Sequence, residues 1–214
     1  MAAPDDELSL IRERTAVLVI ECQNDLVHES HIGGRGLGAV LAAAVAERQV
    51  LPHIANVLQA ARRSSVPVVY LNKESKAGVP TSNAPIYRLG RRIPLLVEGS
   101  WGAQVHPAIA PQPGDYVLPR FLSVDASYGS SLFGTLKALG RDTVVAMGVS
   151  TNFAVEGTVR GAVNRLVDVV VPEDCCASVP EDLHRFSIER ILPLLAVVSS
   201  SAAVIAALDA GATA

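Results

Sequence analysis

The sequence lacks the features that mark membrane, secreted and nucleic-acid-binding proteins. Its hydrophobic residues come in short runs, none of which approaches the ~20 residues that cross a bilayer. The first residues, MAAPDDELSLIRER, are acidic and contain no apolar run like that of a secretory signal. A net charge of −3 gives no basic footprint for nucleic acid or anionic membranes, and three cysteines do not make a disulfide framework. We therefore expect a cytoplasmic protein that binds neither nucleic acid nor membranes.

The sequence does contain ample material for a folded core. Half of its residues are hydrophobic and 18% are charged, a composition that argues against intrinsic disorder. A length of 214 residues suits one α/β domain of ordinary size. Since no internal repeat or linker is visible, we expect a single domain over residues 1–214, with 1–12 as an N-terminal extension.

Short apolar runs alternate with stretches of helical periodicity. The first run, TAVLVIE at 15–21, is typical of a strand buried on both faces and ends in a carboxylate. The expected strands are 15–21, 66–71, 115–118, 143–148, 167–172 and 195–199. The expected helices are 48–64, 130–139, 152–166, 181–193 and 200–208. This alternation predicts an α/β fold, a three-layer α/β/α domain with a mainly parallel six-stranded sheet.

Ligands of such folds bind beyond the carboxyl ends of the strands. This rule selects Glu21, Arg120 and the segment 148–154, which all lie at or just past expected strand ends. The stretch 72–100, rich in Gly, Pro, Ser and Arg, is long for a connection and is expected to be a functional lid or an interface arm.

The segment GVSTNFAVEGT at 148–158 resembles the start of a catalytic helix. Ser150 or Thr151 can cap the helix, and the unpaired backbone N–H groups of its first turn can stabilise an oxyanion or a thiolate. The alternative is an ordinary capped helix without a catalytic role.

Four stretches resemble, in order and at suitable spacing, those of the isochorismatase-like cysteine hydrolase family, which includes nicotinamidases and N-carbamoylsarcosine amidohydrolases. They are AVLVIECQNDL, GSWGAQVHPAIAPQPGDYVLPR, GVSTNFAVEGTVRGA and VVVPEDCCAS. The resemblance implies a Rossmann-like fold and a catalytic triad of Asp, Lys and Cys. Carried over by position, the triad falls on Glu21, Arg120 and Ala154, so all three residues differ from the usual ones.

Each replacement changes what the position can do. Glu21 keeps a carboxylate that can act as a general base or, when protonated in a dry pocket, as an acid. Arg120 does not readily release a proton; it can hold a substrate carboxylate, lower the pKa of Glu21 by pairing, or form a structural salt bridge. Ala154 cannot be a nucleophile. It is either an engineered Cys replacement, a natural residue as in isochorismatases proper, or a sign that catalysis was lost.

The resemblance also implies an oxyanion site, built from a cis peptide between Val149 and Ser150 and from the amide of Ala154. Three aromatic residues lie near the key positions in a chain with only 4% aromatics, and they either line a pocket or pack in the core. They are Trp101, Tyr128 and Phe153.

We expect no metal or other cofactor. Nicotinamidases carry an Asp-x-His motif where this sequence has NKESK, and His28 and His31 lack a convincing third ligand. The side chain of Cys22 is expected to face away from Glu21, and the adjacent thiols at 175 and 176 to be buried in a packed turn.

The residues together predict a hydrolase of a small molecule. The reaction is amide (C–N) hydrolysis if residue 154 is natively Cys, and a nucleophile-free acid/base hydrolysis of vinyl-ether type if Ala154 is native. The alternative is a non-catalytic protein that binds a small molecule or assembles through the same fold. The family resemblance implies a homodimer or homotetramer.

Overall fold

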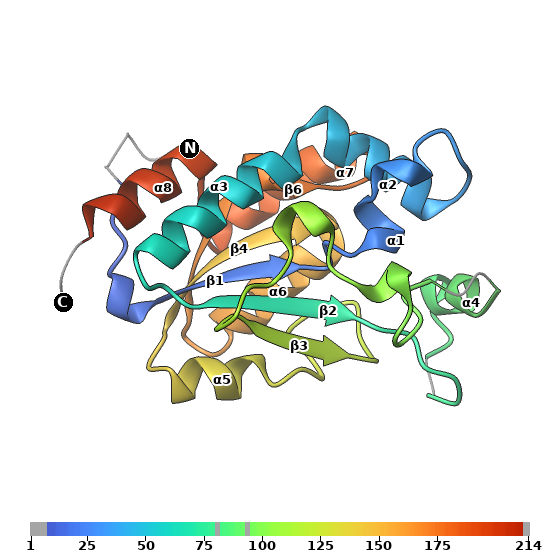
Figure 1. The fold of residues 1–214 in the computed structure, drawn as a ribbon, viewed down its shortest axis with the longest axis horizontal. Helices are drawn as coiled ribbons and strands as arrows, with labels where there is room; N and C mark the ends of the chain where they lie inside the picture. The colour runs from blue at the N-terminus through green and yellow to red at the C-terminus, as the bar shows by residue number, and fades with distance from the viewer. Residues whose placement is uncertain (1–7, 80–81, 93–94, 212–214) are drawn as a thin grey trace.

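The computed structural model describes residues 8–79, 82–92 and 95–211. A parallel sheet runs through the domain in the order β3-β2-β1-β4-β5-β7, with the short strand β6 paired to β4. Figure 1 shows β3, β2, β1 and β4 side by side. The strands are β1 Thr15–Ile20, β2 Val68–Lys73, β3 Tyr116–Arg120, β4 Thr143–Val149, β5 Asp168–Pro172, β6 Cys176–Ala177 and β7 Val197–Ser199. The six expected strands are confirmed, and the seventh, β6, has only two residues and carries too short a pattern to predict.

Helices cover both faces of the sheet. The α-helices are α1 Asn24–Val27, α2 Leu37–Glu47, α3 Val50–Arg63, α4 Pro85–Arg92, α5 Leu132–Ala138, α6 Glu156–Val163, α7 Glu181–Phe186 and α8 Ser201–Ala210. The shorter helical turns are η1 Arg12–Arg14, η2 Glu29–His31, η3 Trp101–Ala103, η4 Pro107–Ile109, η5 Thr151–Val155, η6 Glu173–Cys175, η7 Ser187–Ile191 and η8 Leu192–Leu194. Figure 1 shows α2, α3 and α8 along one side of the sheet and α5 along the other.

Two apolar cores separate the layers. The α3/α8 core joins strand and helix residues that include Val17, Val19, Ile54 and Val204. The α5/α6 core joins a second set that includes Leu18, Ile20, Leu136 and Val159. Successive residues of β1 thus enter opposite cores, because side chains alternate across a strand. The three-layer α/β/α prediction is confirmed, and its continuous apolar strands follow from burial on both faces.

The expected helices are present with changed boundaries. The 152–166 helix begins as the π-helical turn η5 and ends with α6 at Val163, while 181–193 divides into α7, η7 and η8. Two helices were not expected from the sequence: α2, and α4 within the stretch 72–100. Residues 80–81 and 93–94 of that stretch lie outside the described residues.

At the amino end, the described part of the expected extension is attached to the domain. Leu10 is buried and belongs to the α3/α8 core, whereas residues 1–7 lie outside the described residues. Among the described helices, none has both the length and the apolar character that a membrane span requires.

Candidate active site

The tip of β1 carries a buried ion pair. Glu21 directly follows β1, has a positive φ of 53°, and donates its backbone N–H to the carbonyl of Leu71 at 3.1 Å. Its Oε1 accepts a short hydrogen bond from Nη2 of Arg120, the last residue of β3. Because β2 lies between β1 and β3, the side chain of Arg120 reaches across the end of β2 to make this pair.

Burial governs the electrostatics of the pair. The side chain of Arg120 has no exposed surface and that of Glu21 is 15% exposed. Burial raises the pKa of Glu21, and the positive charges of Arg120 and, more weakly, Lys73 oppose that shift. Nε and Nη1 of Arg120 have no acceptor among the described residues. Among the roles expected for Arg120, the structure shows the one in which its guanidinium pairs with the carboxylate of Glu21.

A third charged group, the ammonium of Lys73, lies at the same end of the parallel strands. Lys73 ends β2 and is the register partner of Arg120, so the two side chains start from neighbouring strand ends. Lys73 was not among the expected site residues. The predicted strand stopped at residue 71, two residues early, so the strand-end rule did not reach it.

Polar side chains that follow Glu21 fix the surrounding loops. The side-chain amide of Gln23 donates to the carbonyls of Lys73 (2.8 Å) and Ala103 (2.7 Å), and its oxygen accepts from the N–H of Lys73 at 2.8 Å. Asn24 donates to the carbonyl of Trp101 at 2.9 Å. These bonds hold the end of β2 and the turn η3 against the tip of β1.

The segment that follows β4 begins beside the same tip. Gly148 is the register partner of Ile20, the residue before Glu21. The Val149–Ser150 peptide bond is cis, as the resemblance implied. Ala154 lies in the next turn, is 1% exposed, and belongs to the α5/α6 core together with Ile20. Glu21, Arg120 and Ala154, the positions to which the resemblance assigns the triad, therefore all lie at or beyond the carboxyl ends of parallel strands.

The backbone of η5 is tightly turned. The carbonyl of Ser150 accepts the N–H groups of Phe153 (3.1 Å) and Val155 (3.2 Å), which flank Ala154 in sequence. Phe153 is half-exposed, whereas Thr151 is buried and hydrogen-bonded to His184 Nδ1 at 2.8 Å. A replacement of the Ala154 side chain would not remove any backbone group of this turn.

A family model for the isochorismatase domain matches residues 15–203. The chain belongs to the isochorismatase family. It is 32% identical over 171 residues to a ureidoacrylate amidohydrolase RutB of Methylobacterium radiotolerans, a match that covers 72% of this chain and 65% of the relative. That alignment spans slightly less than two thirds of the relative's length.

Solved structures of the family share the fold. A cysteine hydrolase from Pseudomonas syringae pv. phaseolicola superimposes with a TM-score of 0.84 at 26% identity, covering 98% of this chain and 99% of that one. An N-carbamoylsarcosine amidase from Thermoplasma acidophilum gives a TM-score of 0.70 at 27% identity, covering 88% and 96% respectively. The fold predicted from the sequence is therefore confirmed by comparison as well as by the structure.

The resemblance places the family's nucleophile at residue 154, where this chain carries Ala, and the cysteines of this chain are poor substitutes for a nucleophile. All three thiols are buried, and burial raises their pKa values, that of Cys176 to about 12. The side chain of Cys22 belongs to the α3/α8 core, across the sheet from Ala154. These thiols are packing residues rather than nucleophiles.

The three aromatic residues expected near the site are largely on the surface. Trp101 is 47% exposed and Tyr128 is 65% exposed. The Trp101 ring packs against those of His28 and His31, with centroids 4.9 and 6.1 Å apart. Their expected role in substrate binding remains a proposal.

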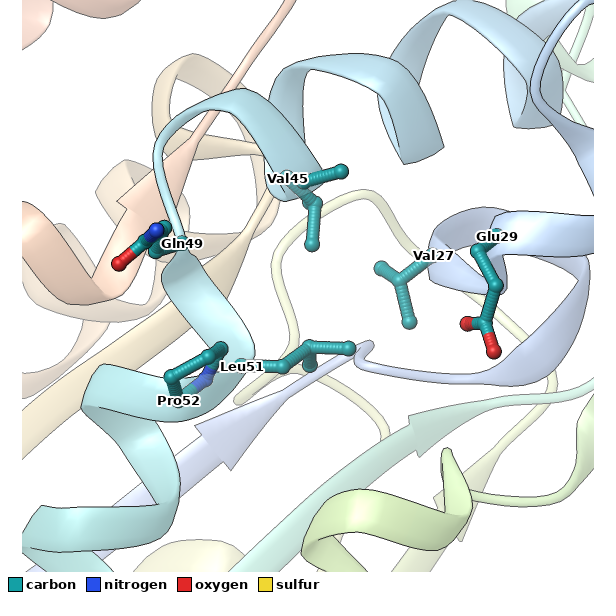
Figure 2. Close-up of a pocket in the computed structure, with 7 residues that line it drawn as sticks. Val27, Glu29, Val45, Gln49, Leu51 and Pro52 are labelled. Carbon is teal, nitrogen blue, oxygen red and sulfur yellow. The ribbon is translucent and has the colours of Figure 1, made fainter.

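Two cavities lie away from the ion pair. One, of about 320 Å³, lies between Val27 and Glu29 on one side and the α2–α3 connection on the other, as Figure 2 shows. The second, of about 640 Å³, lies along the amino-terminal segment and β7. Neither cavity includes Glu21, Arg120 or Ala154 in its lining.

His28 does have a carboxylate and a second histidine nearby, contrary to the sequence-based expectation, whereas His31 does not belong to this group. Ligand atoms of His28, Glu29 and His106 lie within 4.8 Å of one another. However, Nδ1 of His106 accepts the N–H of Ala108 at 3.1 Å, which leaves the ring proton on Nε2 to donate to Glu29 at 3.0 Å. The hydrogen bond from His106 lowers the pKa of Glu29. The ring nitrogens of His106 are therefore both used in hydrogen bonds within the protein. A metal ion bound here would have to displace the bonds to Glu29 and to Ala108.

Proposed function

We propose that this protein is a hydrolase of a small molecule that works by the acid/base chemistry of Glu21, without a covalent enzyme intermediate. The observation that carries the proposal is the buried carboxylate at the tip of β1, which is paired with Arg120. Ala154, at the position where the resemblance implies the nucleophile, is buried and offers no side chain that could attack a substrate. Membership of a family that contains hydrolases supports the reaction class.

The carboxylate is suited to passing a proton in both directions. Burial raises its pKa, which increases the protonated fraction near neutral pH, while Arg120 stabilises the ionised form that remains after donation. With a vinyl ether, protonated Glu21 gives its proton to the alkene carbon. Water adds to the resulting cation, its proton returns to Glu21, and the hemiketal breaks down to a carbonyl compound and an alcohol.

Substitution of Glu21 tests the proposal. Glu21→Gln should lower kcat by roughly 100-fold or more, the usual contribution of a general acid/base, while ligand affinity is retained. The measurement is product formation from a panel of vinyl ethers, amides and ureido compounds. Glu98→Gln, at an exposed carboxylate, is the matched control. A wild-type protein that binds ligands and never converts them would support the non-catalytic alternative.

A second candidate is amide (C–N) hydrolysis through a thioester, which requires a thiol at residue 154. Relatives named as amidohydrolase and amidase favour this reaction for the fold. If the native gene encodes Cys at this codon, C–N hydrolysis becomes the preferred function. Ala154→Cys should then produce measurable ammonia release from small amides or ureido compounds, and no release across a broad panel argues against a latent amidase site.

We also propose that the protein works as a cytoplasmic homodimer or homotetramer. Its mean hydropathy of +0.34 and exposed apolar side chains such as Phe186 (57% exposed) and Leu194 (81% exposed) are consistent with self-association. Sedimentation velocity at several concentrations distinguishes these states from a monomer.

A further inference from the structure

Lys73 holds an unusual position for a lysine. Its Nζ donates to the carbonyl of Glu74 at 2.9 Å and to that of Phe121, the residue after Arg120, at 2.6 Å. The ammonium group is thus folded over the ends of β2 and β3 instead of extending into water. It is half-buried, next to the ion pair formed by Glu21 and Arg120.

The positive charge of Lys73 has no close counter-ion. The charge of Glu21 is engaged by Arg120, and no described carboxylate lies within 4.0 Å of the Lys73 ammonium. Glu21 and, more weakly, Glu74 attract Lys73 only from greater distances. Burial, followed by the positive charge of Arg120, lowers the pKa of Lys73. When Glu21 is ionised, the three groups at these strand ends carry two positive charges and one negative charge.

The ammonium also has an unused donor. An ammonium has three N–H groups, and two of those of Lys73 are taken by backbone carbonyls. A partly desolvated cation gains most from a charged acceptor, because a charge-assisted hydrogen bond is about twice as strong as a neutral one. The third N–H is the natural place for an anionic ligand group.

Lys73 also lies on the face of the sheet that carries Ala154. Leu71 and Leu118, which lie two residues before Lys73 and Arg120 on their strands, pack in or against the α5/α6 core. Side chains two apart on a strand share a face, so Lys73 starts from the face on which Ala154 lies. An anion bound to Lys73 would therefore lie on the same side of the sheet as η5.

We propose that Lys73 binds the carboxylate of a small anionic substrate, an inference that rests on the function proposed above for this site. A neutral amide or ether of the same shape would leave the ammonium without a counter-charge. The substrate class is therefore a compact organic acid whose scissile bond lies within reach of Glu21 when its carboxylate is held by Lys73.

The sequence makes a direct test practical, because it contains only three lysines, at positions 73, 76 and 137. In the full-length protein with ¹³C-labelled lysine, the three Cε signals are followed by NMR during titration with crotonate and, separately, with its neutral counterpart crotonamide. Lys76, which pairs with Glu98, and the exposed Lys137 are internal controls. Lys73→Met identifies the signal, and Lys73→Gln provides a second variant if the first folds poorly.

We expect crotonate to shift the Lys73 signal saturably, crotonamide to leave it unchanged, and both Lys73 variants to weaken crotonate binding by roughly tenfold or more. Parallel shifts of all three lysines, or equal effects of crotonate and crotonamide, would overturn the inference. Saturation by inorganic phosphate but not by crotonate would overturn the carboxylate assignment.

The outcomes also separate this inference from the proposed function. If crotonate binds at Lys73 but no compound is hydrolysed, the anion site stands and the proposed hydrolase function fails. If Glu21-dependent turnover is found and Lys73→Met changes neither KM nor kcat for any substrate, the hydrolase function stands and the role of Lys73 is wrong.

Discussion

The guanidinium of Arg120 has no exposed surface, so the charge of Glu21 affects stability as well as chemistry. Glu21→Gln leaves that guanidinium buried without a counter-ion, and we expect the free energy of unfolding to fall by about 3–5 kcal/mol. Adding Arg120→Met removes the uncompensated charge and should recover much of the stability without restoring turnover. Urea denaturation of the single and double variants measures this, and a double variant no more stable than Glu21→Gln would contradict it.

The burial of His184 predicts that the free energy of unfolding depends on pH. It is 2% exposed, and burial, assisted by the positive charge of Arg48, lowers its pKa from 6.5 to about 4. Its stabilising contribution is therefore present above pH 6.5 and is lost as the pH falls toward 4, because only the unfolded state binds the proton in that window. The loss should be on the order of 3 kcal/mol.

Unfolding by urea at a series of pH values from 7 to 4.5 tests the role of His184. The variant His184→Gln keeps a polar group near Thr151. In this variant, the free energy of unfolding should fall less steeply with decreasing pH, because the contribution of the histidine is absent. An unchanged pH slope in the variant would assign the acid sensitivity to other groups.

The residue scale also shows how far the sequence could identify the site. Glu21 and Arg120 were found because each ends a recognisable apolar strand and because four motifs resemble one family. Lys73 was missed because the expected strand stopped two residues before it, and because the position of its ammonium depends on the carbonyl of Phe121, which is distant in sequence. The partnership of His28 with His106 was missed for the same reason.

At the scale of elements, the pairing of β1 with β4 places the site. Gly148 has a φ of 128°, and a Cβ atom there would meet the carbonyl of Ile20. Gly148→Ala should therefore strain the β1–β4 contact and lower the free energy of unfolding by roughly 2 kcal/mol or more.

Gly134→Ala is the matched control for Gly148→Ala. Gly134 lies within α5 with open space where its Cβ would be, so alanine should stabilise the helix by about 0.5–1 kcal/mol. Thermal and urea denaturation of both variants give the comparison. Similar effects of the two substitutions would show that the contact at Ile20 does not restrict residue 148.

At the scale of the whole molecule, the segment before β1 is joined to the last helix, α8. Arg12 donates from Nε to the carbonyl of Leu208 and from Nη2 to that of Asp209, both at 2.7 Å. These carbonyls belong to the last turn of α8, where backbone acceptors have no helical partner and a cation is favoured. Arg12→Ala should therefore lower the free energy of unfolding by about 1 kcal/mol.

A neighbouring arginine provides the control for Arg12. Arg63 contacts the Asp209 carboxylate at 3.3 Å, with both side chains about half exposed. Such a surface pair contributes little, so Arg63→Ala should change the unfolding free energy by less than about 0.5 kcal/mol. Chemical denaturation resolves this difference, and equal losses in the two variants would contradict the proposed capping of α8 by Arg12.

The sequence by itself determined the α/β class, the six main strands and the family, because alternating apolar runs, helical periodicity and contiguous motifs are written along the chain. It also placed Glu21 and Arg120 at strand ends. Only the tertiary structure decided that these residues, 99 positions apart, form a buried ion pair and that Lys73 folds over the adjacent strand ends. The ion pair depends on the order of the strands in the sheet, and the burial of these charges depends on the packing around them. Local sequence patterns predict neither, because both involve segments that are distant in the sequence.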